Sequence, residues 1–404
     1  MRQAYNMKIT ILPSKLQGTI SAIPSKSQAH RLLICAAFSS TPLDLICLST
    51  NEDIEATVQC LNAIGARITR TETGYYIIPI QNTPKKADLY CRESGSTLRF
   101  MLPIIAALGI DGTFHMEGRL PSRPLSPLLE ELCRMGCTID RQSDSTLRCS
   151  GKLQCGEYQI DGSVSSQYIT GLIFALSLLS GESTLNITGQ IESAPYIDMT
   201  IQALQIFGVN SDGHTFTGYR PFTAPQQYIV EGDWSNAAFF LGAKFLGNQI
   251  TINGLSANSK QGDKIAYILF QLLSDWVELS GKDTPDLIPI LAVVAAANKG
   301  AHFYNISRLR LKESDRIEAV KDMLIALGGK VITTKDSMTV YPAPFNSCVI
   351  DSKNDHRIAM AAAIASTIST GPITILGAEC VKKSYPSFWD DFVQLGGYYE
   401  QYIR

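Results

Sequence analysis

The sequence contains no hydrophobic run long enough to cross a lipid bilayer, because a membrane-spanning helix needs about 20 consecutive apolar residues. The longest run, from Leu287 to Ala297, has the length of a buried helix in a globular domain. The first residues, Met1–Met7, also lack the apolar stretch of a signal peptide. We therefore expect a cytoplasmic protein without a membrane partner.

The chain also has little net charge, since 35 Lys and Arg residues stand against 37 Asp and Glu residues, a formal charge of −2. Nucleic-acid-binding proteins usually carry a basic patch interleaved with aromatic residues, and the sequence shows no such pattern. We therefore expect no nucleic-acid partner. Any anionic ligand must be bound by a local arrangement of basic residues.

A metal-binding pattern is missing as well. The ten cysteines are scattered, and Cys133 and Cys137 form a single C-x3-C pair without the second pair that a zinc site needs. We expect the reduced thiols of a cytoplasmic protein and no bound metal.

What the sequence contains instead is a unit of about seventy residues that recurs along the chain. Its first mark is a Gly between an apolar helical segment and a strand-like stretch, where a helix often ends in a left-handed residue. These marks are Gly65, Gly136, Gly208, Gly328 and Gly396. The longer step from Gly208 to Gly328 contains another, degraded copy of the unit, near Leu272–Leu279, in which the Gly mark is lost.

The second mark of the unit is a short polar head that opens a helix rich in Ala, Leu and Ile. The heads keep the same spacing apart from one shorter step, which chance recurrence of capping residues does not easily produce. The heads are Ser25–Ser27, Ser94–Ser96, Ser165–Gln167, Asp233–Ser235, Pro285–Asp286 and Asn354–His356. Each unit reads as helix, strand, helix, strand and strand, so the predicted fold class is α/β.

Six units over 404 residues predict two similar domains, each built from three repeats. The linker is expected within Tyr219–Pro225, which has two Pro residues and no helical pattern. A first strand, Lys8–Leu12, precedes the first head, and the sequence alone leaves its partner open.

The heads suit anions, because the unpaired N–H groups of a helix N-terminus carry about half a positive charge. Basic residues lie near several heads, including Lys26 and Arg123, and Lys312 and Arg316 share one helix face. Each motif alone has a simpler interpretation, such as a salt-bridged surface helix or, for Asp286, a helix cap. Recurrence at equivalent positions of the repeats favours an anion-binding role.

Four motifs resemble those of the 5-enolpyruvylshikimate-3-phosphate synthase (EPSP synthase) family. Ser25–Arg31 resembles the family's S-K-S-x-x-x-R, and Gly162–Gln167 its G-S-x-S-S-Q. Lys312–Arg316 resembles K-E-[ST]-D-R, and Asp355–Arg357 resembles D-H-R. The motifs occur in the family's order, and the resemblance runs from about residue 13 to 388, nearly the whole chain.

The resemblance implies the enolpyruvyl transferase inside-out barrel, with two three-repeat domains that close on substrate at a hinge. It places residues 23–222 in the N-terminal domain and residues 1–22 with 223–404 in the C-terminal domain. The implied reaction transfers the enolpyruvyl group of phosphoenolpyruvate to the 5-hydroxyl of shikimate 3-phosphate and releases phosphate. This step lies in the shikimate pathway to chorismate and the aromatic amino acids. The partners are these two substrates, without metal or organic cofactor, and we expect a monomer.

Carried over position by position, the resemblance implies two sets of binding residues. Shikimate 3-phosphate would be bound by Lys26, Ser27, Arg31, Ser165, Ser166, Gln167, Tyr196, Asp286 and Lys312. Phosphoenolpyruvate would be bound by Lys26, Gly95, Arg123, Gln167, Arg316, Arg357 and Lys383. Hydroxyl donors suit phosphate and sugar-like hydroxyl groups, while Lys and Arg neutralise charge.

Addition and elimination at the enol carbon require two proton transfers. The resemblance makes Asp286 the candidate for the proton of the substrate hydroxyl and Glu313 the candidate for the methylene carbon of phosphoenolpyruvate. Lys26 is a third candidate for proton transfer. The basic residues would stabilise the charge that develops as phosphate leaves.

The chain departs from the family pattern at three places. Glu93–Ser96 stands where many members have N-A-G-T, and Phe100 stands where Pro is common. Both bear on the phosphoenolpyruvate-site inhibitor glyphosate, so sensitivity is not inferred from the resemblance. Arg308 replaces an Asn that contacts the shikimate substrate.

Two alternatives remain at this point. The UDP-N-acetylglucosamine enolpyruvyl transferase family has Lys-Asn at Lys26–Ser27 and a loop Cys within Arg119–Pro124, where this chain has no Cys. A catalytically silent paralogue would bind phosphorylated metabolites without turnover. The carboxylates Asp286 and Glu313 argue against it, because a pure anion binder does not need them.

Overall fold

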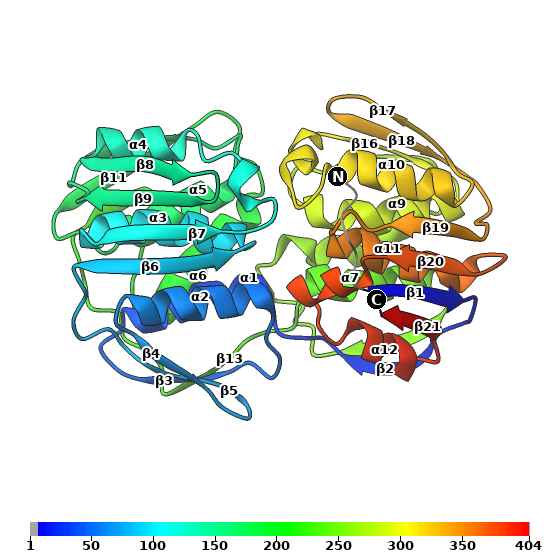
Figure 1. Cartoon of the computed structure of the whole chain (residues 1–404), viewed down its shortest axis with the longest axis horizontal. Coiled ribbons are helices and arrows are strands. Elements are labelled where there is room, and N and C mark those ends of the chain that lie inside the picture. The colour runs from blue at the N-terminus through cyan, green and yellow to red at the C-terminus, as the bar shows by residue number, and fades with distance from the viewer. Residues whose placement is uncertain (1–6, 404) are drawn as a thin grey trace. The chain divides into compact units, whose positions relative to one another are not determined.

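The computed structural model describes residues 7–403, and the chain divides into two compact units, seen in Figure 1. The continuous unit is Pro24–Glu231. The discontinuous unit combines the segment that ends at Ile23 with the segment that begins at Gly232. The chain therefore passes between the units twice, once after Ile23 and once after Glu231.

The continuous unit alternates helices and strands. Its helices are α1 (Lys26–Ala37), α2 (Glu52–Ala63), α3 (Gly95–Leu108), α4 (Leu128–Arg134), α5 (Ser166–Leu176) and α6 (Ala194–Ile206). Its strands are β3 (Leu43–Ile46), β4 (Arg67–Arg70), β5 (Gly74–Ile78), β6 (Lys86–Arg92), β7 (Asp111–Met116), β8 (Cys137–Ser143), β9 (Thr146–Gly151), β10 (Glu157–Asp161), β11 (Glu182–Thr188), β12 (Thr215–Thr217) and β13 (Gln227–Ile229).

The discontinuous unit has the same kinds of element. Its helices are α7 (Trp234–Phe245), α8 (Ala266–Leu272), α9 (Ile288–Ala297), α10 (Arg316–Ala326), α11 (His356–Ala365) and α12 (Phe388–Gln394). Its strands are β1 (Met7–Leu12), β2 (Gln17–Ser21), β14 (Gln249–Asn253), β15 (Val277–Ser280), β16 (Ala301–Tyr304), β17 (Lys330–Thr333), β18 (Ser337–Tyr341), β19 (Cys348–Asp351), β20 (Ile373–Leu376) and β21 (Tyr398–Ile403).

Each unit contains three small sheets built on one pattern. Two strands pair in parallel, and up to two further strands extend the sheet through antiparallel pairings. In the sheet β6-β7-β9-β8, for example, β6 and β7 are parallel, and β9 and β8 follow as an antiparallel hairpin. In the sheet β19-β20-β1-β21, the N-terminal strand β1 occupies the inner hairpin position between β20 and β21. Strand Lys8–Leu12, whose partner the sequence left open, thus pairs within the discontinuous unit.

The two passages of the chain explain the one irregularity in this pairing. In the other repeats a strand, its helix and the next strand form one unit, as in β6–α3–β7, and the two strands pair in parallel. At each passage the first strand lies in one unit while its helix and second strand lie in the other. The partners are therefore exchanged: β2 pairs with β14 in the discontinuous unit, and β13 pairs with β3 in the continuous unit.

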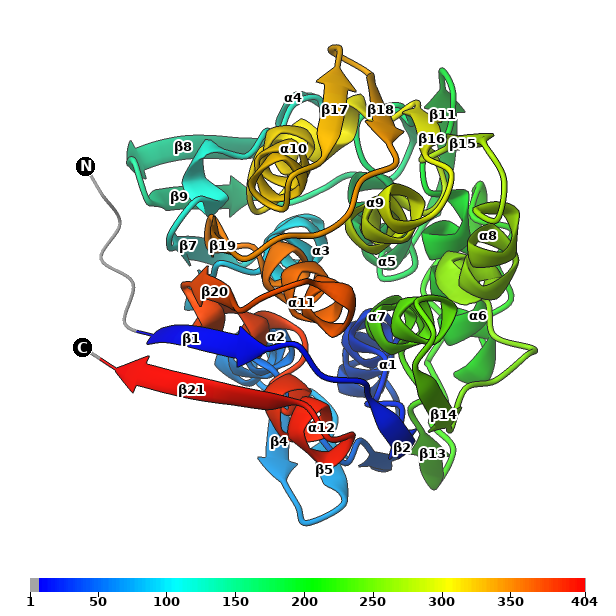
Figure 2. The same cartoon turned by 90° about the vertical axis from the view of Figure 1, so that its right-hand side faces the viewer.

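The first helix of most repeats is buried along nearly its whole length, whereas the second buries one face. Buried residues fill α1, α3, α5, α9 and α11 almost completely, but lie along only one face of α2, α6 and α10. A helix that is apolar all round belongs in a core, and a helix with one apolar stripe belongs on its surface. In the discontinuous unit α7, α9 and α11 contact one another, and Figure 2 shows them with their axes toward the viewer.

Five of the six polar heads predicted from the sequence are N-caps of these first helices. Ser25, Ser94, Ser165, Asp233 and Asp355 each accept a hydrogen bond from a backbone N–H of the first turn. Such a bond satisfies an N–H group that would otherwise be buried without a partner. The sixth head, Pro285–Asp286, lies instead in a 3-10 turn, Pro285–Leu287, that leads into α9.

The Gly marks of the second helices are confirmed too. Gly65, Gly136, Gly208, Gly328 and Gly396 follow α2, α4, α6, α10 and α12, and all have positive φ. The fourth repeat is the degraded copy, because the chain goes from α8 directly to β15 without the hairpin that follows α2, α4 and α10.

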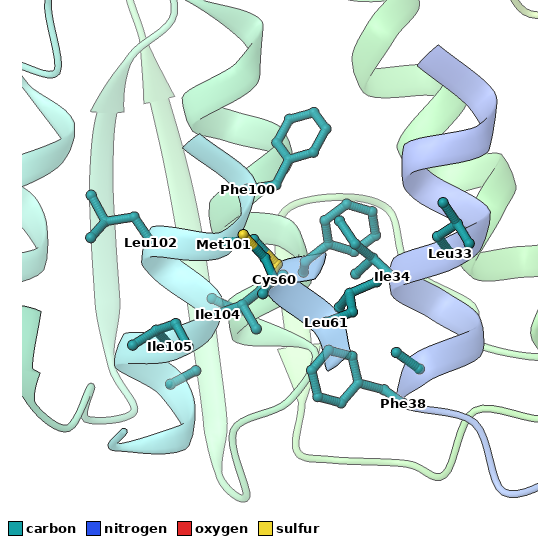
Figure 3. Close-up of a cluster of buried hydrophobic side chains, with 14 of the residues drawn as sticks. Leu33, Ile34, Phe38, Cys60, Leu61, Phe100, Met101, Leu102, Ile104 and Ile105 are labelled. Atoms are coloured by element: carbon teal, nitrogen blue, oxygen red, sulfur yellow. The ribbon is translucent and has the colours of Figure 1, made fainter. Parts of the chain in front are cut away.

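Each unit has its own hydrophobic core. The core of the continuous unit gathers buried side chains from its helices and from the inner faces of its sheets. Figure 3 shows part of it, where Leu33 and Ile34 of α1, Leu61 of α2 and Met101 of α3 meet. The core of the discontinuous unit is a separate cluster.

The boundaries of the units differ from those expected from the sequence. The expected linker, Tyr219–Pro225, lies inside the continuous unit, where Phe222 is buried and its carbonyl oxygen accepts a hydrogen bond from the Ser40 N–H at 2.7 Å. The two Pro residues indicated a linker, but the chain continues past them into β13, which pairs with β3 of the same unit. The passage follows Glu231, where β13 has ended.

Helices α3 and α5 approach closely at Gly171, which generates a stability prediction. An alanine Cβ at this position would lie 2.2 Å from the carbonyl oxygen of Arg99 and 3.1 Å from Cγ of Pro103, both in α3. Ala normally stabilises a helix interior relative to Gly by about 1 kcal/mol. We expect Gly171→Ala to destabilise the protein by about 1–3 kcal/mol, because the helices must separate. The urea unfolding midpoint measures this change, and a higher midpoint for the variant would contradict the close approach.

Candidate functional site

The residues singled out by the motifs lie, with neighbours that no motif included, in two clusters at the helix heads, one in each unit. The basic cluster lies in the continuous unit and comprises Lys26, Arg31, Asp53, Gly95, Arg99, Arg123 and Gln167. The mixed cluster lies in the discontinuous unit and comprises Ser235, Asp263, Asp286, Lys312, Glu313, Arg316, Asp355 and Arg357. Each is described by itself.

In the basic cluster, Lys26 occupies the first position of α1 and contacts a carboxylate that the sequence did not reveal. Its Nζ donates to Oδ2 of Asp53 at 2.8 Å, and both side chains are largely buried. Asp53 belongs to the first turn of α2. The ion pair fixes the ammonium group at the head of α1, where the N–H groups of the first turn also favour an anion.

Arg31 lies one turn further along α1 and is 2% exposed. Its guanidinium donates to the Ser27 carbonyl at 2.6 Å, to the Tyr196 carbonyl at 2.8 Å and to Oγ1 of Thr200 at 2.9 Å. Phe100 lies against the guanidinium, with 5.3 Å between Cζ and the ring centre. Burial lowers the pKa of Arg31 to about 10, so the group remains charged at neutral pH.

A second arrangement in the basic cluster surrounds Gly95, the first residue of α3. An added Cβ at Gly95 would lie 2.8 Å from Nη1 of Arg123 and 2.9 Å from Nη1 of Arg99. Arg99 donates to Oε1 of Gln167 at 2.6 Å and to the Pro124 carbonyl at 3.2 Å. Two guanidinium groups therefore lie against a helix head that has no side chain, which suits a carboxylate or phosphate.

A buried chain of hydroxyl groups lies behind the heads of α1 and α3. Nδ1 of His30 and Oγ1 of Thr57 are 2.7 Å apart, and Thr57 is in turn 2.7 Å from Thr97. Thr97 donates to Oγ of Ser94, the cap of α3, at 2.8 Å. Burial, together with the charges of Lys26 and Arg31, lowers the pKa of His30 well below its usual value. His30 is therefore a neutral structural link among α1, α2 and α3.

Arg316 is the centre of the mixed cluster. It is the first residue of α10, and its side chain is 1% exposed. Its guanidinium donates to Asp286 at 2.8 Å, to Glu313 at 2.6 Å and to Asp355 at 2.9 Å. Burial alone would lower the pKa of Arg316, but the three carboxylates together raise it. Loss of one partner of such a buried network typically costs about 3–5 kcal/mol, so the arrangement is rigid.

Asp286 is shared by three cations of the mixed cluster. Besides the bond from Arg316, Nη2 of Arg357 lies 3.2 Å from Oδ2 and Nζ of Lys312 lies 3.4 Å from Oδ1. Burial lowers the pKa of Lys312 to about 8, although the charge of Asp286 opposes this shift. Lys312 therefore titrates close to neutral pH, as a group that exchanges protons needs to do.

A second carboxyl group, Asp263, lies buried behind Asp286. Its Oδ2 accepts a short hydrogen bond from Ser235, whose backbone carbonyl accepts from Nη1 of Arg357 at 3.4 Å. Its Oδ1 is buried without a hydrogen-bond partner in the described part of the chain. Burial and the charge of Asp286 raise the pKa of Asp263 to about 7. The carboxyl group is therefore substantially protonated at neutral pH.

The remaining cation expected in the discontinuous unit is Lys383, which is buried and donates to the Asn354 carbonyl at 3.0 Å. Asn354 directly precedes Asp355, the cap of α11, so Lys383 is tied to the same helix head that receives Arg316. Arg308, at the position where the family has Asn, donates to the Lys282 carbonyl at 2.9 Å.

The candidates from the sequence are thus joined by contacts within each unit. In the continuous unit, Arg31 links Ser27 to Tyr196, Gly95 adjoins Arg123, and Gln167 follows the Ser165–Ser166 head of α5. In the discontinuous unit, contacts link Asp286, Lys312, Glu313, Arg316 and Arg357. The motifs did not include Asp53, Asp263 or Thr200, which the structure shows in contact with these residues. Arg99 is the one added residue with a signal in the sequence, since it stands one helical turn after Gly95.

The arrangement suits phosphate and carboxylate ligands and proton transfer. Cations at helix heads bind anions, while Asp286 and Glu313 lie in hydrogen-bond contact with basic groups that can stabilise their charged forms. Within residues 7–403, no three His, Cys, Asp or Glu side chains gather in the manner of metal ligands. None of the helices in that range has the length and apolar character needed to cross a membrane.

Comparison with known proteins gives one consistent family. Residues 12–392 match the family model described as EPSP synthase (3-phosphoshikimate 1-carboxyvinyltransferase). The 3-phosphoshikimate 1-carboxyvinyltransferase of Clostridium kluyveri is 40% identical over 420 residues, which cover 96% of this chain and 97% of that protein. The protein of the same name from Clostridium perfringens is 37% identical over 421 residues, covering 96% and 98% of the two chains.

Two solved structures share the fold. An EPSP synthase from Acinetobacter baumannii superposes with a TM-score of 0.80 at 22% identity, covering 98% of this chain and 100% of that one. The enolpyruvyl transferase NikO from Streptomyces tendae superposes with a TM-score of 0.76 at 15% identity, covering 99% and 100%. The α/β fold of two three-repeat parts expected from the sequence is therefore confirmed.

The raised pKa of Asp263 generates a prediction about stability and pH. An unfolded Asp ionises near pH 3.9, so ionisation of the folded carboxyl group opposes folding, and stability falls as pH rises toward 7. Asp263→Asn keeps an acceptor for Ser235 and removes this loss. We expect its unfolding free energy, relative to the unsubstituted protein, to rise by roughly 1–3 kcal/mol between pH 5 and pH 8.

Urea unfolding at both pH values measures the effect. Asp275→Asn, at an exposed position, controls for the removal of one negative charge from the surface. A relative stability of Asp263→Asn that stays constant or falls with pH would show that Asp263 is ionised in the folded protein throughout this range.

Proposed function

Because the chain belongs to the EPSP synthase (3-phosphoshikimate 1-carboxyvinyltransferase) family, we propose that it transfers the enolpyruvyl group of phosphoenolpyruvate to shikimate 3-phosphate. The observation that carries the proposal is the family match over residues 12–392, which includes every helix head of the basic and mixed clusters. The acceptor is the 5-hydroxyl group, and the second product is phosphate. The reaction belongs to the shikimate pathway toward chorismate and the aromatic amino acids.

Shikimate 3-phosphate is assigned to polar and charged residues of both units. In the continuous unit these are Lys26, Ser27, Arg31, Ser165, Ser166, Gln167 and Tyr196. In the discontinuous unit they are Asp286 and Lys312. The assignment is supported by chemistry, because small hydroxyl and amide donors at helix heads suit a phosphorylated sugar-like ring.

Phosphoenolpyruvate is assigned to a set of cations and to Gly95, whose backbone is not covered by a side chain of its own. Lys26, Arg123, Arg316, Arg357 and Lys383 supply charge, Gln167 supplies an amide, and Gly95 leaves the head of α3 accessible. Support comes from the closeness of the Arg123 guanidinium to Gly95, since a planar guanidinium binds a carboxylate or phosphate through two hydrogen bonds.

The proposed reaction proceeds by addition and elimination. As the 5-hydroxyl oxygen bonds to C2 of phosphoenolpyruvate, Asp286 accepts the hydroxyl proton and Glu313 supplies a proton to the methylene carbon. The resulting methyl group then returns a proton, the C–O bond to phosphate breaks, and the double bond re-forms. Lys26 serves as a further proton carrier. The cations stabilise the phosphate oxygens as that bond breaks.

Asp286 and Glu313 differ in their contacts, and this difference supports their separate roles. Asp286 contacts three cations, which favours its ionised, proton-accepting form. Glu313 pairs with Arg316 at 2.6 Å, and its side chain is partly exposed. The UDP-N-acetylglucosamine transferase alternative is not favoured by the family match. Turnover distinguishes an enzyme from a silent paralogue. The monomeric state and cytoplasmic location expected from the sequence stay predictions.

Phosphate release tests the proposed reaction directly. We expect phosphate release from phosphoenolpyruvate only when shikimate 3-phosphate is present, with the enolpyruvyl ether as the product identified by mass spectrometry. Release that instead requires UDP-N-acetylglucosamine would assign the chain to the sister activity. Binding of both substrates without release would leave the silent-paralogue interpretation.

Replacement of the two carboxylates tests the proton-transfer roles. We expect Asp286→Asn and Glu313→Gln each to lower kcat by about 10²–10⁴-fold, because each removes a positioned acid or base. Asp283→Asn, in the same loop as Asp286, is the matched control and should retain kcat. If a folded Asp286→Asn variant retained kcat, another group would have to accept the hydroxyl proton.

Gly95 provides a test that separates the two substrates. The Cβ of Gly95→Ala would lie within 3.0 Å of the guanidinium groups of Arg123 and Arg99, so both must move. We expect the KM for phosphoenolpyruvate to rise about ten- to hundredfold, because displacement of a positioning group weakens binding and alignment. The KM for shikimate 3-phosphate is the internal control. Equal increases in both constants would contradict the assignment of this position to phosphoenolpyruvate.

A further inference from the structure

Two buried threonines, Thr170 of α5 and Thr200 of α6, form a hydrogen-bonded pair beside Arg31. Both are fully buried, and their hydroxyl oxygens are 2.9 Å apart. Nε of Arg31 donates to Thr200 at 2.9 Å, and Nη2 donates to Thr170 at 3.4 Å. Neither threonine belongs to a motif in the sequence.

Only one assignment of hydrogen-bond donors and acceptors is consistent with these contacts. Oγ1 of Thr200 donates to the Tyr196 carbonyl at 3.0 Å, so its single hydrogen is used and its lone pairs receive Arg31 and Thr170. Thr170 therefore donates to Thr200 and accepts from Arg31. No amino acid without a hydroxyl group can complete this arrangement.

The pair determines what Arg31 can offer to a ligand. A guanidinium has five N–H donors, and four of those of Arg31 bind Thr200, Thr170 and the carbonyls of Ser27 and Tyr196. Among the described residues, one hydrogen on Nη1 has no acceptor. Arg31 thus acts mainly as a buried connector that fixes the backbone at Ser27 in α1 and at Tyr196 in α6.

We propose that Thr170 and Thr200 are positioning residues for shikimate 3-phosphate, acting through Arg31 on Ser27 and Tyr196. The inference rests on the proposed function, which assigns those three residues to this substrate. The guanidinium remains charged in its buried site, where burial lowers the pKa of Arg31 only to about 10. An unpaired N–H of a buried charge is unfavourable, so loss of the Thr200 hydroxyl forces Arg31 to move.

The test compares Thr200→Val, which removes the hydroxyl at constant shape, with Thr200→Ser, which keeps it. In the full chain we expect Thr200→Val to raise the KM for shikimate 3-phosphate about tenfold, equivalent to about 1.4 kcal/mol. The KM for phosphoenolpyruvate and kcat should change less than about threefold. Thr200→Ser should stay close to the unsubstituted enzyme. Thr170→Val should act in the same direction and provides a second variant if Thr200→Val does not fold.

Thr367→Val is the matched structural control. Thr367 is a buried threonine of the discontinuous unit that accepts a hydrogen bond from Asn248 at 3.1 Å. Its replacement should lower stability without a selective change in the KM for shikimate 3-phosphate. An equal rise of both KM values in Thr200→Val, or no rise, would overturn the inference.

Calorimetric binding of shikimate 3-phosphate separates this inference from the proposed function. If the unsubstituted protein releases no phosphate, the proposed activity fails. A roughly tenfold weaker affinity of Thr200→Val, restored in Thr200→Ser, would then still support the positioning role. Equal affinities of Thr200→Val and the unsubstituted protein would overturn the role whether or not turnover occurs.

Discussion

A helix that is buried on all sides carries most of its polar groups near its ends, and this constraint organises the whole molecule. The first turn of such a helix presents backbone N–H groups that need acceptors, so Ser or Asp recurs at the heads of α1, α3, α5, α7 and α11. The rest of each buried helix is mostly apolar. Charged side chains are therefore concentrated where the helix dipole also favours anions. The repeated polar heads, the apolar core and the position of the candidate site all follow from the need to satisfy the ends of buried helices.

The two clusters satisfy the cations described here in different ways. In the mixed cluster Arg316 is matched by three carboxylates, so Asp286 and Glu313 are held in place by charge. In the basic cluster Arg31 and Arg99 bind mainly carbonyl, hydroxyl and amide oxygens, which orient them without cancelling their charge. Cations with neutral partners suit anionic substrates, whereas carboxylates beside fixed cations suit proton transfer. This difference between the clusters arises because the neighbouring helix heads supply carboxylates to Arg316 but mainly neutral oxygens to Arg31 and Arg99.

Much of this organisation is readable from the sequence, because caps and Gly residues act locally. The spacing of the heads, the five positive-φ Gly residues and the degraded fourth repeat all came from patterns within a few residues of each feature. The passage after Glu231 was missed because it depends on which distant strand β13 pairs with. The partners Asp53 and Asp263 were missed for a related reason: each lies 27 or 28 residues from its contact on another element. The Thr170–Thr200 pair likewise looks like ordinary helix interior until α5 and α6 are packed together.

Because strands are exchanged at the two passages, the continuous unit can form from one segment, whereas the discontinuous unit needs two segments far apart in the chain. Every strand of the continuous unit lies within Pro24–Glu231, so its three sheets can form from one segment. In the discontinuous unit β2 pairs with β14, and β1 pairs with β20 and β21, so both early strands pair with strands much later in the chain. Pairing over such separations costs more chain entropy than pairing within a repeat. Strands β1 and β2 are thus synthesised well before the strands with which they pair, and the mixed cluster belongs to the unit whose sheets depend on this pairing.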